Sequence, residues 1–227
     1  VGAPYDDLGT GVAAGSAYVF VRSGTTWTEQ AKLTASDPAF ADWFGHSVAL
    51  DGDTALVGAY QDDHAGGPDA GSAYVFVRDG SNWLEQAKLT ASDAGVADAF
   101  GWSVALSGDT ALVGAYFDDH PTRGGFDVDV GSAYVFVRSG TNWAEQAKLT
   151  PSDSHPFQWF GFSVAVSGET ALVGSPLGDL PGVPDAGSGY VYVRSGTTWV
   201  EQAKLTASDA APSHHFGRSL ALSGDGA

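Results

Sequence analysis

The sequence contains no cysteine, which excludes disulfide bonds, zinc–thiolate sites and thiol nucleophiles. Methionine is missing too, even at position 1, and the chain begins within an apolar pattern. We therefore expect a processed or trimmed piece of a longer protein. There is no run of 18 apolar residues and no signal-peptide pattern, which predicts a soluble chain without membrane insertion.

Basic residues are scarce as well. The chain has 10 Lys and Arg residues against 27 Asp and Glu residues, a formal net charge of −17. Such a charge repels phosphate backbones and anionic lipid headgroups, so we expect no nucleic acid among the partners.

One sequence unit occurs four times. Its markers are a Glu-Gln-Ala-Lys-Leu-Thr block at 29–34, 85–90, 145–150 and 201–206, a Gly-Ser block from Gly15, Gly71, Gly131 and Gly187, and Phe-Gly pairs at 44–45, 100–101, 160–161 and 216–217. All three series step by 56, 60 and 56 residues, and the longer step comes from a loop around Thr122–Asp129. Such self-similarity is typical of repeat architectures.

Each unit predicts four short strands. In the second unit they cover 47–50, 54–59, 73–78 and 83–90, with turn signals at Asp51-Gly52-Asp53 and Asp79-Gly80-Ser81-Asn82. No unit holds a helical apolar period. The fold class is therefore all-β, a β-propeller of four four-stranded repeats of about 56 residues.

We interpret residues 1–227 as a single domain with repeat phases 44–99, 100–159, 160–215, and 216–227 joined with 1–43. Residues 219–225 match a first strand, and Val1-Gly2-Ala3 matches part of a second strand. Pairing the two ends would close a four-bladed ring and remove the exposed sheet edges. The alternative is a fragment of a larger ring or an open array.

The Phe-Gly pairs, followed some 14 residues later by Gly-Ala-Pro or a variant, resemble the FG-GAP repeat of integrin alpha-subunit heads and of microbial secreted or surface proteins. The matching segments are Phe44-Gly45 with Gly58-Ala59-Tyr60, Phe100-Gly101 with Gly114-Ala115-Tyr116, Phe160-Gly161 with Gly174-Ser175-Pro176, and Phe216-Gly217 with Gly2-Ala3-Pro4. The resemblance implies a propeller at an extracellular or cell-surface location. It does not imply the family's calcium loop, because turns such as Asp51-Gly52-Asp53 are too short to surround a cation.

Strand alternation places the long loops of all units on one side of the disc. Most of the acidic residues and the histidines lie in these loops, so we expect one strongly negative face that binds ligands. Its aspartates could bind calcium, a possible cofactor, or could cap local backbone N–H groups. The candidates form two repeated series and one half-loop: Asp7, Asp63, Asp119 and Asp179; Asp37, Asp93, Asp153 and Asp209; and Asp127 with Asp129.

Tryptophans divide into two groups. Trp27, Trp83, Trp143 and Trp199 begin the fourth strand of each unit, which predicts core packing between blades. Trp43, Trp102 and Trp159 flank the Phe-Gly pairs beside the acidic loops, where they either stack on sugars or plug the mouth of the ring. His64 and His120 share an Asp-Asp-His position and are weaker ligand-binding candidates.

Most basic side chains recur with the repeat. Arg22, Arg78, Arg138 and Arg194 and Lys32, Lys88, Lys148 and Lys204 lie near a repeated Glu at 29, 85, 145 and 201, which predicts ion pairs and cation–π contacts at the rim.

No catalytic motif is present in the sequence. We therefore expect a non-catalytic extracellular binding or adhesion module whose acidic loop face binds a protein or glycan ligand. One alternative is a self-associating structural subunit of a surface layer or filament. Another is a polysaccharide-active enzyme with a site near residues 117–129.

Overall fold

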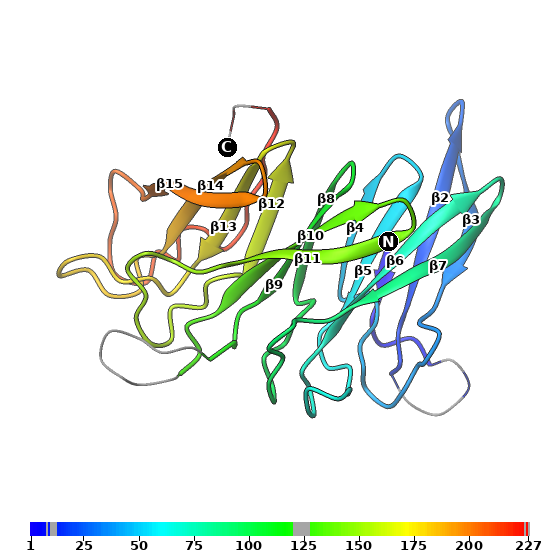
Figure 1. Cartoon of the computed structure of the whole chain (residues 1–227), viewed down its shortest axis with the longest axis horizontal. Coiled ribbons are helices and arrows are strands. Elements are labelled where there is room, and N and C mark those ends of the chain that lie inside the picture. Colours follow the sequence, from blue (N-terminus) through cyan, green and yellow to red (C-terminus); the bar gives the residue numbers. More distant parts are fainter. Residues whose placement is uncertain (8, 10–12, 120–127, 225, 227) are drawn as a thin grey trace.

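The computed structural model describes residues 1–7, 9, 13–119, 128–224 and 226, and in these residues every regular element is a β-strand. The strands form four antiparallel sheets in which neighbours along the chain are hydrogen-bonded neighbours in the sheet. Figure 1 shows the sheets following one another along the molecule. The predicted all-β repeat fold with a propeller layout is confirmed.

The sheets repeat the same meander. The first contains β1 (Gly2–Ala3), β2 (Ser16–Ser23) and β3 (Thr26–Leu33); the second β4 (Ser47–Asp51), β5 (Thr54–Ala59), β6 (Ser72–Asp79) and β7 (Asn82–Leu89); the third β8 (Ser103–Ser107), β9 (Thr110–Ala115), β10 (Ser132–Ser139) and β11 (Asn142–Leu149); the fourth β12 (Ser163–Ser167), β13 (Thr170–Ser175), β14 (Ser188–Ser195) and β15 (Thr198–Leu205). The strands predicted for the second unit agree with β4–β7 to within about one residue.

The Phe-Gly pair joins consecutive sheets. Phe100 is fully buried and packs edge-on against Tyr134 and Phe136, with ring centroids 5.5 and 5.9 Å apart. Gly101 has a φ of +92°, and a Cβ there would lie 2.3 Å from the carbonyl oxygen of Ser72 in the preceding sheet. Only glycine allows this approach of two backbones, which explains why the pair recurs.

The apolar core lies between the sheets. Leu56 and Val75 of the second sheet, for example, pack against Val113 and Tyr134 of the third. The fourth-strand tryptophans extend this core where a sheet precedes them: Trp199 is 8% exposed and donates its Nε1–H to Gln146 at 3.0 Å. Trp27 is 63% exposed, so its predicted core position is wrong, because no sheet precedes the first one in the described chain.

The predicted closure by terminal pairing is not observed in the described residues. There β1 pairs with β2 alone, and residues 219–224 form no strand. Instead, Gly224 donates its N–H to Ser167 at 3.3 Å, just as Gly168 donates to Ser107 at 3.1 Å. The final hairpin turn therefore packs on the fourth sheet, and Figure 1 shows the first and fourth sheets at opposite ends of the molecule.

Candidate ligand-binding face

The long connections lie along the lower edge of the molecule in Figure 1, opposite the hairpin turns between first and second strands. The first strands of consecutive sheets, β4, β8 and β12, pack beside one another along the inner side of the array. Residues at the long-loop end of these strands therefore meet across sheet boundaries. The three tryptophans predicted as ligand-binding residues lie there.

These tryptophans belong to one continuous band of rings, which we call the aromatic row. Its members are Tyr5, Trp43, His46, Tyr60, Trp102, Tyr116, Phe117, Trp159 and Phe162. Trp43 contacts Tyr60 edge-on at 5.2 Å, and Tyr60 contacts Trp102 at 4.9 Å. The row continues through Tyr116, 4.6 Å from Trp102 and 5.6 Å from Trp159.

The sequence did not reveal that the tyrosines and phenylalanines complete this row. The signal is present, since Tyr60 and Tyr116 directly follow β5 and β9 at one repeat position. The contacts, however, cross from one sheet to the next and depend on how the sheets pack. Trp43, Trp102 and Trp159 remain half-buried.

The fold, and not the tryptophan side chain, fixes the backbone at two of these positions. Trp43 and Trp159 have φ values of +55° and +58°, and Ala99 has +58° at the same repeat position. The left-handed conformation is therefore a property of the Phe-Gly turn, and alanine is compatible with it in this chain.

A hollow of about 100 Å³ opens beside the row and is lined by Tyr60, Gln61, Asp69, Ala97 and Phe117, among others. Burial, with smaller contributions from Tyr5 and Asp69, raises the pKa of Tyr60 to about 12. The hollow combines apolar ring surface with a hydroxyl and a carboxylate. Small polar ligands with an apolar face, such as sugars, match this combination.

Of the two histidines predicted as ligand-binding residues, His64 and His120, the structure describes His64. Nδ1 of His64 accepts the N–H of Gly66 at 3.0 Å, and its Nε2 lies 3.0 Å from the carbonyl oxygen of Gly71. These contacts hold its own loop together, outside the aromatic row. His120 lies outside the described residues. His46, which was not among the ligand-binding candidates, joins the row 4.4 Å from Trp102, and desolvation lowers its pKa.

The first aspartate series caps the loops. The Oδ1 atoms of Asp63, Asp119 and Asp179 accept backbone N–H groups of Asp69, Asp129 and Asp185 at 2.8, 2.7 and 2.8 Å, and Asp7 accepts that of Gly9 at 2.9 Å. These are the hydrogen bonds expected if the aspartates cap backbone N–H groups of their own loops instead of binding calcium. Asp127 lies outside the described residues, and burial, followed by the charge of Asp119, raises the pKa of Asp129.

The second aspartate series holds lysines. Asp37, Asp93 and Asp153 each accept a Lys Nζ at 2.7 Å, from Lys88, Lys148 and Lys204. Asp209 lies in an exposed turn. In the part of the chain that the structure describes, no three His, Asp or Glu side chains gather to hold a metal ion. Calcium binding by these aspartates stays a prediction.

The prediction that the lysines pair with the repeated glutamates is wrong. Lys88 bridges Asp37 of the preceding loop and Asp62 of its own sheet at 2.7 and 2.8 Å. Glu85 instead accepts the backbone N–H and the hydroxyl of Ser36. The predicted cation–π contacts are confirmed, for example where the Arg194 guanidinium lies 5.9 Å from the Trp199 ring. The acidic partner of each lysine depends on how neighbouring sheets pack, and strand order alone does not reveal this packing.

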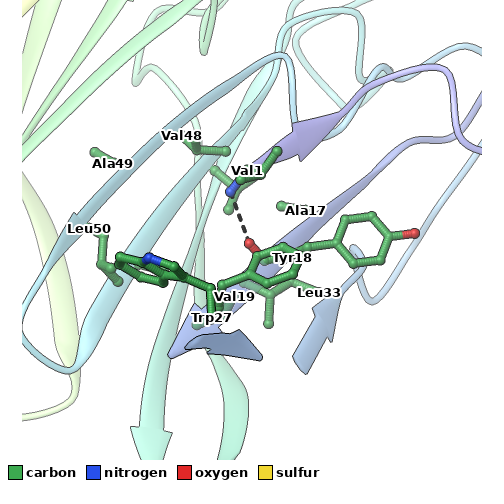
Figure 2. A pocket seen from close by; sticks show the side chains of 12 residues that line it. Val1, Ala17, Tyr18, Val19, Trp27, Leu33, Val48, Ala49 and Leu50 are labelled. Atoms are coloured by element: carbon green, nitrogen blue, oxygen red, sulfur yellow. Dashed lines mark hydrogen bonds between the residues drawn. The ribbon is translucent and has the colours of Figure 1, made fainter. Parts of the chain in front are cut away.

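A second, apolar groove of about 250 Å³ lies between the first and second sheets, and Figure 2 shows Val1, Val19, Trp27 and Leu50 around it. At the next two interfaces Leu56 and Leu112 occupy the corresponding place. Nothing in the lining of the groove points to a particular ligand.

Comparison with protein families agrees with the repeats seen in the fold. The FG-GAP repeat model matches residues 27–76, 83–136, 143–192 and 199–227. The chain belongs to the FG-GAP repeat family. FG-GAP repeats are typical of extracellular or surface proteins. No curated protein matches the chain, and the described residues contain no helix long and apolar enough to cross a membrane.

Proposed function

We propose that this FG-GAP repeat protein is a non-catalytic, extracellular binding module that recognises a glycan through its aromatic row. The observation that carries the proposal is the continuity of the row, which extends from Tyr5 to Trp159 across three sheet boundaries. A ligand with several sugar rings could contact several members at once, and the contacts would add in free energy.

Charge supports a neutral or weakly charged glycan over an acidic one. The chain carries a net charge of −17, and Asp69 lines the hollow beside the row. Carboxylates accept hydrogen bonds from sugar hydroxyls but repel uronates and sulfates. The apolar ring faces match the C–H faces of a pyranose.

The proposal is tested by screening the protein against immobilised neutral and acidic glycans and then measuring affinity for the best soluble ligand by calorimetry. The test variant is Trp43→Ala/Trp159→Ala, since Ala99 shows that alanine suits this position. With about 0.5–1.5 kcal/mol for each of the two aromatic contacts, we expect affinity to fall about 5- to 150-fold.

The matched control is Trp27→Ala, which removes an exposed tryptophan outside the aromatic row. It should leave glycan affinity unchanged. Equal loss of affinity in both variants, or no binding to any neutral glycan, would contradict the proposed function. Thermal melting of each variant checks that the fold is intact.

A further inference from the structure

A polar cluster recurs on the long-loop side of the sheets, and its centre is an aspartate that follows the second strand. In the third sheet this residue is Asp118, 3% exposed. Its Oδ2 accepts the hydroxyl of Ser132 at 2.5 Å and the Nζ of Lys148 at 2.7 Å. Asp62 of the second sheet has the same partners in Ser72 and Lys88, at 2.6 and 2.8 Å.

The fourth sheet lacks this carboxylate, because glycine occupies position 178. The backbone is otherwise unchanged: Gly178 donates its N–H to Ser175 O at 3.0 Å, and Asp118 donates to Ala115 O at 3.1 Å. A Cβ on Gly178 would lie 3.1 Å from the carbonyl oxygen of Ser175, 3.4 Å from its Oγ and 3.5 Å from the Oγ of Ser188, the counterpart of Ser132. Ser188 therefore keeps the place of Ser132, whereas Ser175 replaces Ala115 beside this position.

Two of those surrounding side chains are buried without a partner in the described part of the chain. They are the hydroxyl of Ser188 and both amide atoms of Gln158, and both residues are 0% exposed. Gln158 stands at the repeat position of Asp98. Its carbonyl oxygen accepts the N–H of Leu177 at 3.3 Å and the hydroxyl of Ser175 at 2.8 Å, so position 158 is a neighbour of position 178. Buried polar groups without partners are costly and rare in native proteins.

The polar cluster of the fourth sheet also carries less negative charge than that of the third sheet. Lys148 bridges two carboxylates, Asp93 and Asp118, whereas Lys204 holds one, Asp153, at 2.7 Å. Gly178 and Gln158 together replace two carboxylates of the third-sheet cluster with neutral residues. One ammonium, one hydroxyl and one amide N–H₂ are then available around a place that elsewhere holds a carboxylate.

We propose that the fourth sheet binds a small carboxylate anion, of formate or acetate size, in the place of the missing aspartate side chain. The hydroxyl of Ser188 and the ammonium of Lys204 donate to it, as Ser132 and Lys148 donate to Asp118. The amide N–H₂ of Gln158, which replaces the carboxylate of Asp98, is a third donor. We expect larger carboxylates to bind less well, because the group found at this place in the other sheets is a single CH₂–COO⁻ group. This site is separate from the aromatic row and does not depend on the proposed glycan binding.

The test measures thermal melting of the whole chain in increasing sodium formate, at an ionic strength held constant with sodium chloride. For the wild type, Tm should rise with the logarithm of the formate concentration once formate exceeds its Kd, by about 2–4 °C when formate reaches about four to five times its Kd. Gly178→Asp should melt higher than the wild type without formate and should not respond to it. Its backbone has no positive φ, so aspartate suits the position.

A matched variant in the third sheet tests the converse change, removal of the aspartate side chain. Asp118→Gly should melt lower than the wild type and should recover part of the loss in formate, because Ser132 and Lys148 then lose the carboxylate that they contact. The recovery should be smaller than the wild-type response at the fourth sheet, since Asp98 stands where that sheet has Gln158. Ser188→Ala should keep the fold and respond less to formate than the wild type. An equal response of wild type and Gly178→Asp would overturn the proposal. No response of the wild type would overturn it too, since water alone would then fill the site.

Discussion

At the scale of the single residue, burial changes the pKa of two aspartates that occupy one repeat position. Asp42 and Asp98 lie two positions before Phe-Gly, are 2% and 5% exposed, and accept a backbone N–H of their own loop. Desolvation raises the pKa of both to about 6, against the partial compensation of that hydrogen bond. Their charged forms therefore destabilise the fold near neutral pH.

The effect of pH follows from the direction of this shift. The folded state binds the proton of Asp98 more tightly than the unfolded state, whose pKa is near 3.8. This contribution to stability is full below about pH 4 and is lost as pH rises to about 6. Asp98→Asn, which imitates the protonated form, should raise the free energy of unfolding by about 1–3 kcal/mol at pH 7.5 and by little at pH 4.

Thermal or urea unfolding at both pH values checks this prediction. Gln158 already places an amide at the same repeat position, which supports the choice of asparagine. The control is Asp209→Asn at an exposed turn, which should change stability little at either pH. If Asp98→Asn destabilised the protein at pH 7.5, the carboxylate would be stabilising there and the account of its burial would be wrong.

At the scale of the element, the fourth-strand tryptophan of each sheet is covered by the sheet that precedes it in the chain. The fourth-strand tryptophan is 8% exposed in the fourth sheet and 63% exposed in the first. Trp199→Ala should therefore cost about 3–5 kcal/mol, whereas Trp27→Ala should cost less than about 1 kcal/mol. Urea unfolding of both variants gives the comparison. Equal costs would mean that the first sheet packs in solution against something that covers Trp27.

The elements themselves could be predicted from the sequence. Alternating apolar residues and Asp-Gly or Ser-Gly turns mark the strands β4–β7 to within about one residue, because strand patterning is local information. The ion pairs could not be predicted in the same way. Lys88 pairs with Asp37, 51 residues away, and that contact depends on how two sheets pack.

At the scale of the whole molecule, the sequence predicted the sorting of loops but not the complete site. Trp43, Trp102 and Trp159 were identified by their place beside Phe-Gly, and the structure brings them into one row. Tyr60 and Tyr116 were missed because they look like ordinary strand ends. Closure through the two ends was also predicted, yet the final hairpin turn packs on the fourth sheet.

Repetition separates structural from functional residues at this scale. The aspartates that cap loops or hold lysines recur in nearly every unit, as a requirement of the fold would. The aromatic row varies from unit to unit, with His46, Trp102, Phe162 and Arg218 at one repeat position. A binding surface built on a repeated scaffold is expected to vary in this way.

The most direct test of glycan recognition by the aromatic row uses the seven tryptophan indole N–H signals in a ¹⁵N-correlated NMR spectrum of the protein, titrated with the best glycan. The account predicts that the signals of Trp43, Trp102 and Trp159 shift together and saturate at one Kd. The signals of Trp27, Trp83, Trp143 and Trp199 should stay in place. Shifts confined to these four, with the aromatic row unaffected, would contradict the account.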